Sequence, residues 1–166
     1  MNKLQNIILE IIYKISNTEG VFDFGDDTLY GLKNYIARHS LANDEYYVSE
    51  RAFSLFREYG FTVPFQRAKL SKLKPYFTYE HPVPVSITAA FIRNSSRTLE
   101  EISTILEFAD CVTLVTKEED KHLLELHRHV MPTEWIYLKS SNFARYESAG
   151  IKMRKEKIRM KGRLVR

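Results

Sequence analysis

The chain has 166 residues, of which 44% are hydrophobic and 28% charged, a composition typical of one folded domain with a hydrophobic core. Its single cysteine excludes a disulfide scaffold and a zinc site built from thiolates, and no apolar run is long enough to cross a membrane. The net charge of +4 is concentrated at one end, because residues 152–166 hold eight basic residues and one acid. We therefore expect a cytoplasmic protein without a membrane segment, whose basic end attracts polyanions.

The first half of the chain is mostly helical in pattern. An amphipathic helix over 3–15 is predicted by six apolar residues at helical spacing, Leu4, Ile7, Ile8, Ile11, Ile12 and Ile15. The next predicted elements are an acidic loop or short strand over 21–27, a helix over 28–39, and a helix over 50–59 that Ser49 caps and Gly60 ends.

Two strands and several capped helices are predicted in the second half. In chain order they are a strand over 76–80, a helix over 85–93, a helix from the Thr98–Glu101 capping box to 109, a strand over 111–115, a helix from the Thr116–Glu119 capping box to 129, and a helical turn over 142–148 that Gly150 closes. The fold class is therefore α+β, a mainly helical single domain over 1–151 with a few short strands, followed by a basic C-terminal tail over 152–166.

The most chemically informative string is Glu80-His81-Pro82-Val83-Pro84, where a predicted strand runs into a proline loop. A histidine can take a proton from water or bind a metal near neutral pH, and a neighbouring carboxylate can orient the ring or add charge for a cation. The alternative is that His81 only caps the strand end.

A second cluster of such side chains lies on the predicted helix that begins at Thr116. Its first turn carries Glu119 and Asp120, and His122 follows on the face that also holds Glu118 and Glu125. Together with His81, these groups suffice for a one-metal hydrolytic site. Acids at a helix start also suit the helix dipole without any metal.

This order of strand, Glu80-His81, intervening helix, and helix rich in acids and histidines resembles the HNH-type (ββα-metal) nucleases, and most of all their small phage-type and prophage-type members. The resemblance covers residues 76–129, the candidate nuclease-like core. It implies that His81 is the general base, with Glu80 beside it, and that Glu119, Asp120 and His122 hold a divalent Mg, Mn or Zn ion.

Basic residues outside this core are candidates for contact with nucleic acid. Residues 61–79 contain four cations, five aromatic rings and no acid, so cations can bind phosphates and rings can stack on bases; alternatively, the rings belong to the core. The predicted nucleic-acid-binding residues are Arg67, Lys69, Lys72, Lys74, Arg145, Tyr146, Lys152, Arg154, Lys155, Lys157 and Arg159. The alternative for Arg145 and Tyr146 is that they pack and pair inside the domain.

Three functions are consistent with these patterns. The first is a metal-dependent nuclease that hydrolyses phosphodiester bonds, acting on DNA rather than RNA. The second is a non-catalytic nucleic-acid-binding or regulatory protein that uses the same basic surfaces. The third is an inhibitor or immunity-type protein, whose body over 1–151 holds 17 basic and 20 acidic residues and so could bind a basic partner.

Overall fold

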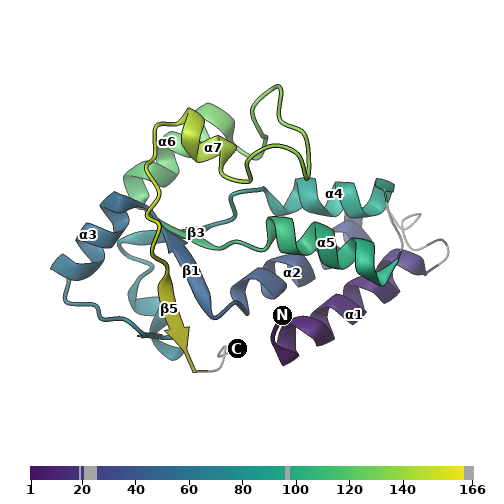
Figure 1. Cartoon of the computed structure of the whole chain (residues 1–166), viewed down its shortest axis with the longest axis horizontal. Helices are drawn as coiled ribbons and strands as arrows, with labels where there is room; N and C mark the ends of the chain where they lie inside the picture. Colours follow the sequence, from purple (N-terminus) through teal and green to yellow (C-terminus); the bar gives the residue numbers. More distant parts are fainter. Residues whose placement is uncertain (19, 21–25, 96–97, 163–166) are drawn as a thin grey trace.

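Helices surround one small sheet in the computed structural model of the chain (Figure 1). The elements are α1 (Lys3–Asn17), α2 (Asp26–Leu41), β1 (Glu45–Val48), α3 (Glu50–Glu58), β2 (Phe65–Gln66), the 3-10 helix η2 (Arg67–Lys72), β3 (Phe77–Glu80), α4 (Val85–Ser95), α5 (Leu99–Ala109), β4 (Thr113–Thr116), α6 (Lys117–His127), α7 (Ala144–Ser148) and β5 (Ile158–Lys161). The structure describes residues 1–18, 20, 26–95 and 98–162. Of the acidic loop or strand predicted over 21–27, residues 21–25 lie outside this part of the chain.

The α+β fold class is confirmed, and the helices predicted from local signals occur close to their expected positions. Both predicted capping boxes form, because the hydroxyls of Thr98 and Thr116 accept hydrogen bonds from the amides three residues later. Helix α6 ends at His127, two residues before the predicted end, and Arg128 after it has a positive φ of 42°. Among the described residues, no helix is long and apolar enough to cross a membrane.

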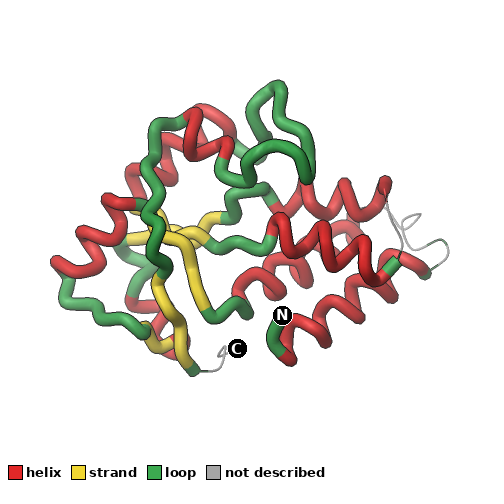
Figure 2. The backbone as a smooth tube through the Cα atoms, viewed as in Figure 1, coloured by secondary structure: helices red, strands yellow, loops and turns green. Residues whose placement is uncertain are grey.

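The five strands form one sheet in the order β2-β5-β1-β4-β3 (Figure 2). Strands β1 and β4 are parallel, and the outer strand β3 is antiparallel to β4. Strand β5 is antiparallel to β1 and parallel to β2. Only β3 and β4 were predicted, from aromatic, β-prone residues in β3 and an apolar run in β4. Strands β1, β2 and β5 were not predicted, and their partners in the sheet are distant in sequence.

The basic end of the chain contributes to this sheet. Ile158 and Met160 of β5 are buried, while Arg159 and Lys161 between them are exposed, which is the alternation of a strand with one covered face. The segment predicted as a tail over 152–166 is therefore part of the domain as far as the structure describes it, and its cations are held on a strand.

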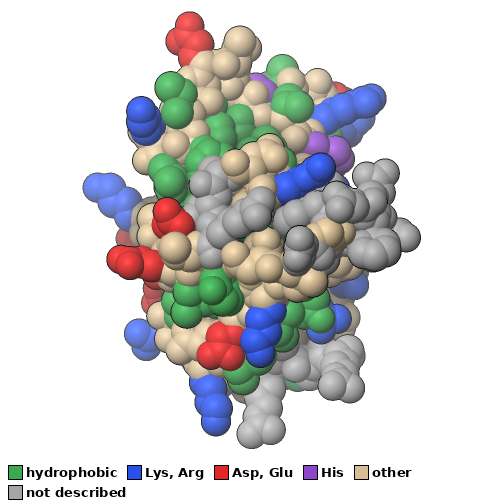
Figure 3. All heavy atoms as spheres, turned by 90° about the vertical axis from the view of Figure 1, so that its right-hand side faces the viewer, with side chains coloured by type: hydrophobic (Ala, Val, Ile, Leu, Met, Phe, Trp, Pro, Cys, Tyr) green, Lys and Arg blue, Asp and Glu red, His purple; other side chains and the backbone are tan. Residues whose placement is uncertain are grey.

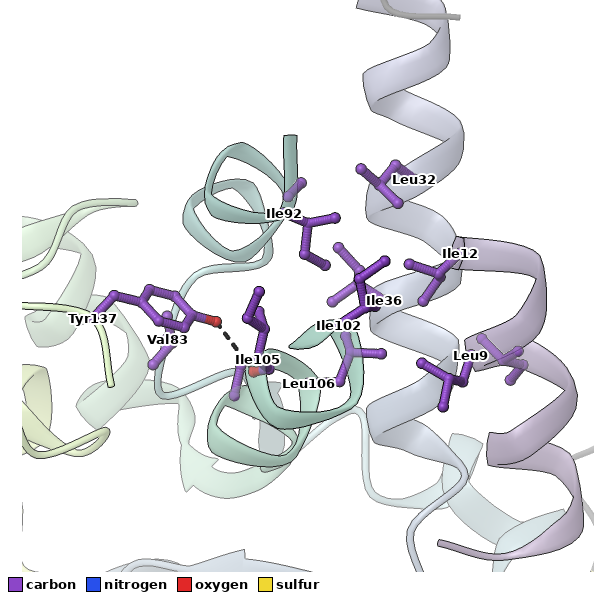
Figure 4. Close-up of a cluster of buried hydrophobic side chains, with 13 residues drawn as sticks. Leu9, Ile12, Leu32, Ile36, Val83, Ile92, Ile102, Ile105, Leu106 and Tyr137 are labelled. Atoms are coloured by element: carbon purple, nitrogen blue, oxygen red, sulfur yellow. Dashed lines mark hydrogen bonds between the residues drawn. The ribbon is translucent and has the colours of Figure 1, made fainter. Parts of the chain in front are cut away.

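Three hydrophobic clusters are found among the described residues; the two larger ones divide the molecule into a helical half and a sheet half, and the third joins Val115, Leu123, Tyr146 and Ile151. The helical cluster joins α1, α2, α4 and α5, where Ile12, Ile36 and Ile102 point toward one another (Figure 4). The second cluster lies between the sheet and α3, with Phe56 at its centre. Full burial of each such side chain contributes about 1.5–3 kcal/mol.

The surface at the helical end has mixed charge. Basic and acidic side chains are interspersed there, and no patch of one sign covers the described part of this face (Figure 3). Two other segments, η2 and residues 152–161, each carry several exposed cations close together in sequence.

Candidate functional site

The segment with the candidate chemistry forms a strand–strand–helix unit. Strand β3 pairs antiparallel with β4 so that Glu80 lies opposite Thr113, and α6 follows β4 directly and packs against both strands. Helices α4 and α5 are inserted between the two strands. Glu80 lies at the end of the first strand and His81 directly follows it.

Glu80 is held in a buried ion pair with an arginine from a different part of the chain. Its Oε2 lies 3.5 Å from Nη1 of Arg145, whose side chain is 1% exposed. The pKa of Glu80 is raised to about 7, mainly by burial; the Arg145 charge lowers it, and the nearby Asp120 adds a smaller upward contribution. Glu80 is therefore close to half-protonated at neutral pH.

His81 experiences the opposite shift. Burial of its ring lowers its pKa to about 4, although the charge of Asp110 acts weakly in the other direction. Its Nε2 is buried and has no hydrogen-bond partner among the described residues. The ring is therefore neutral over most of the pH range.

Glu80 and His81 share one pocket. It has a volume of about 210 Å³ and is lined by Glu80, His81, Pro84, Val85, Ser86, His129 and Arg145. A neutral imidazole and a carboxyl that can stay protonated thus face one small space beside a guanidinium. Titratable groups with shifted pKa values gathered in a cleft are typical of catalytic sites.

Arg145 is held by three elements of the domain. Beside its contact with Glu80, it donates hydrogen bonds to the backbone carbonyl oxygens of His81, at 3.3 Å, and Arg128, at 2.6 Å. It thereby joins α7 to the end of β3 and to the end of α6. Arg145 was predicted as a nucleic-acid-binding residue, with internal packing and pairing as the alternative, and its contact with Glu80 is such an internal pair.

The three residues predicted as helix-side metal ligands have different surroundings. Asp120 lies next to Glu80: its Oδ2 accepts a hydrogen bond from Thr78, and its Oδ1 is buried without a partner among the described residues. Glu119 accepts hydrogen bonds from the Thr116 amide, at 2.9 Å, and the Ser49 hydroxyl, at 2.7 Å.

His122, the third, is exposed and lies in another pocket. This second pocket, of about 500 Å³, is lined by Glu50, Arg51, Glu118, Glu119, His122, Ala149, Gly150, Ile151 and Lys152. The structure therefore brings Asp120 toward Glu80, and it does not bring Glu119 and His122 into the His81 pocket.

The predicted metal ligands are divided between the second pocket, which Glu119 and His122 line, and the buried side of α6, where Asp120 lies. Within the described ranges, three His, Cys, Asp or Glu side chains do not gather where they could hold one ion. Glu80 already faces the Arg145 guanidinium, and Glu119 is used in helix capping. The Mg, Mn or Zn ion stays a prediction from the sequence, and we assign no chemical step to it.

The contacts of Glu119 lead to a stability prediction. We expect Glu119→Ala to cost about 2 kcal/mol of folding free energy, because it leaves the buried Ser49 hydroxyl and the Thr116 amide without their acceptor. The matched variant Glu101→Ala, in the exposed capping box of α5, should cost only about 0.5–1 kcal/mol. Chemical denaturation measures both. A Tm that rises with Mg²⁺, Mn²⁺ or Zn²⁺ in wild type but not in Glu119→Ala would instead assign Glu119 to a metal.

Three of the predicted nucleic-acid-binding residues face the interior. Arg145 and Tyr146 are buried in α7, and Arg67 is 8% exposed. Arg67 pairs with Asp44 and donates hydrogen bonds to the carbonyl oxygens of residues 42, 43 and 162, so it ties the start of β1 to the end of β5. These internal contacts explain the position of the Arg67 side chain, and no contact with nucleic acid is needed to explain it.

The other predicted cations reach solvent. Those on or next to η2 and those in the C-terminal segment are exposed at Lys69, Lys72, Lys74, Lys152, Lys155, Lys157 and Arg159. The 3-10 helix η2 directly follows β2, and the last residue of β2 pairs with the last residue of β5. Helix η2 therefore begins beside the end of β5. Lys157 lies over the ring of Tyr47, and half-buried Arg154 lies over Phe53 and pairs with Glu156.

Comparison of the chain with protein-family models, with curated proteins and with solved structures gave no match. Two features of the described residues bear on function, namely the chemistry of the His81 pocket and the exposed cations.

Proposed function

We propose that the protein hydrolyses phosphodiester bonds of nucleic acid, preferentially DNA, in the pocket shared by Glu80, His81 and Arg145. One observation carries the proposal: two adjacent side chains with oppositely shifted pKa values, about 7 for Glu80 and about 4 for His81, line the same pocket. Pairs of titratable groups whose pKa values are pushed apart in one cleft suit an acid and a base. The strand–strand–helix order supports the same assignment.

The proposed reaction needs one proton acceptor and one proton donor. His81 takes a proton from a water molecule through Nε2 as the water oxygen forms a bond to phosphorus. The bond from phosphorus to the leaving oxygen breaks, its electron pair stays on that oxygen, and Glu80 supplies the proton that neutralises it. Exchange with solvent then returns a proton to Glu80 and removes one from His81.

The exposed cations provide a binding surface for the polyanion. Lys155, Lys157 and Arg159 lie on or beside β5, and Lys69 and Lys72 lie on η2, which follows the neighbouring strand. Contacts from such cations to phosphates release counterions, so binding would weaken as salt is added. They position a strand and carry no base specificity.

The test is cleavage of plasmid DNA and of RNA by wild type and by His81→Gln, each with Mg²⁺, Mn²⁺, Zn²⁺ or excess EDTA. We expect cleavage by wild type and a loss of about 100-fold or more in His81→Gln, because general base catalysis contributes that much. His127→Gln, which changes a histidine outside the pocket, should cleave like wild type. Equal rates for wild type and His81→Gln would contradict the proposal.

A non-catalytic nucleic-acid-binding protein is the second candidate, favoured by the run of exposed cations in residues 152–161. It gives salt-sensitive binding without cleavage, and the binding is indifferent to His81→Gln. Under either function, Lys155→Ala should weaken binding for all sequences and lower the slope of log affinity against log salt by about 1. Gel-shift titrations at several salt concentrations measure this slope.

A further inference from the structure

The His81 pocket has a fixed positive charge of its own. Among the described residues that line it, only Arg145 carries a permanent cationic group, and its guanidinium lies where it meets both Glu80 and the backbone of His81. The resemblance to the ββα-metal nucleases implies a divalent cation held by Glu119, Asp120 and His122. Here the ligands for such a cation do not gather within the described ranges.

The guanidinium is rigidly placed and has unused capacity for hydrogen bonding. Its Nη1 and Nη2 groups are held by carbonyl oxygens from the ends of β3 and α6, and the side chain is 1% exposed. Its Nε is buried and has no partner within the part of the chain that the structure describes. The 3.5 Å distance to Glu80 Oε2 is longer than a strong charge-assisted hydrogen bond. A second anion could therefore share the guanidinium.

We propose that Arg145 contacts the scissile phosphate and neutralises its developing negative charge, in the place of a divalent metal ion; this inference rests on the function proposed above. A guanidinium presents N–H donors in a planar fork that matches two phosphate oxygens. Donors that are fixed before the reaction need no reorganisation as negative charge develops in the transition state.

This role of Arg145 does not change which bonds form and break in the proposed hydrolysis. The guanidinium keeps its protons throughout, since arginine does not deprotonate in proteins. It donates hydrogen bonds to the non-bridging phosphate oxygens while His81 and Glu80 move the two protons. No redox step or additional reactant is needed.

The first experiment uses wild type alone and compares DNA cleavage in excess EDTA with cleavage in Mg²⁺ or Mn²⁺. We expect the same rate in both. Loss of cleavage in EDTA that returns with added metal would overturn the inference and leave the proposed function intact. Absence of cleavage under all conditions would overturn both, and this result is distinct from metal-dependent cleavage.

The second experiment uses Arg145→Lys and Arg145→Ala, with Tm measured for each variant. We expect Arg145→Lys to lower the cleavage rate about 100-fold, because a lysine cannot reproduce the fork of donors. Guanidinium ion at low, non-denaturing concentration should restore part of the rate of Arg145→Ala without changing its Tm. The same ion should not restore His81→Gln.

Arg67→Lys is the matched control, because Arg67 is also a buried arginine that binds backbone carbonyls but does not line the pocket. It should lower the Tm and leave the cleavage rate of the folded protein unchanged. A folded Arg145→Lys with the wild-type rate would contradict the inference. If neither Arg145 variant folds, the EDTA comparison with wild type still decides between a metal and the guanidinium.

Discussion

Glu80→Gln and His81→Gln are expected to change the pH dependence of folding stability in opposite directions. The folded-state pKa of Glu80 is about 7, above its ordinary value of 4.5. The folded protein therefore holds this proton more tightly than the unfolded chain does, and the stability that the proton contributes is lost as the pH rises from 4.5 to 7. The loss is about 3 kcal/mol. Glu80→Gln removes it, so this variant should gain stability relative to wild type over that pH window.

The sign is reversed for His81. Its folded-state pKa is about 4, below its ordinary value of 6.5, so the unfolded chain binds the proton more tightly. The stability associated with the neutral ring is present above pH 6.5 and is lost as the pH falls to 4. This loss is again about 3 kcal/mol. His81→Gln should therefore gain stability relative to wild type as the pH is lowered.

Urea denaturation at intervals across this range measures both effects, with Glu118→Gln as the control for an exposed glutamate that contributes little. In wild type the two slopes oppose each other, so its own stability should vary little between pH 4.5 and pH 6.5. Parallel curves for all four proteins would show that neither side chain is buried as described, and the acid–base assignment would lose its basis.

The local parts of the fold could be predicted from the sequence. The Thr98 and Thr116 capping boxes and the apolar spacing of α1 are signals within a few residues, and all three form as expected. The residues of strand β5 alternate between apolar and basic side chains, which is the pattern of a half-buried strand. Its cations led to the prediction of a tail, because the partners that bury Ile158 and Met160 come from segments about a hundred residues away.

The part of the candidate site that lies within a few residues of sequence could also be predicted. Glu80 and His81 are neighbours at a strand end, which the sequence shows directly. The partner of Glu80 is contributed by α7, and no local pattern distinguishes a buried Arg145 from an exposed one. Glu119 fits both a capping box and a metal site in sequence, and the Ser49 hydrogen bond that occupies it comes from a different element.

The rate of DNA cleavage as a function of pH tests the acid–base pair most directly. We expect kcat/KM to be largest between pH 4 and pH 7, where His81 is neutral and Glu80 is protonated. The rate should fall on the acid side as His81 takes a proton and on the alkaline side as Glu80 loses one, and the alkaline fall should disappear in Glu80→Gln together with most of the rate. A wild-type rate no higher than that of His81→Gln at every pH would contradict catalysis in this pocket.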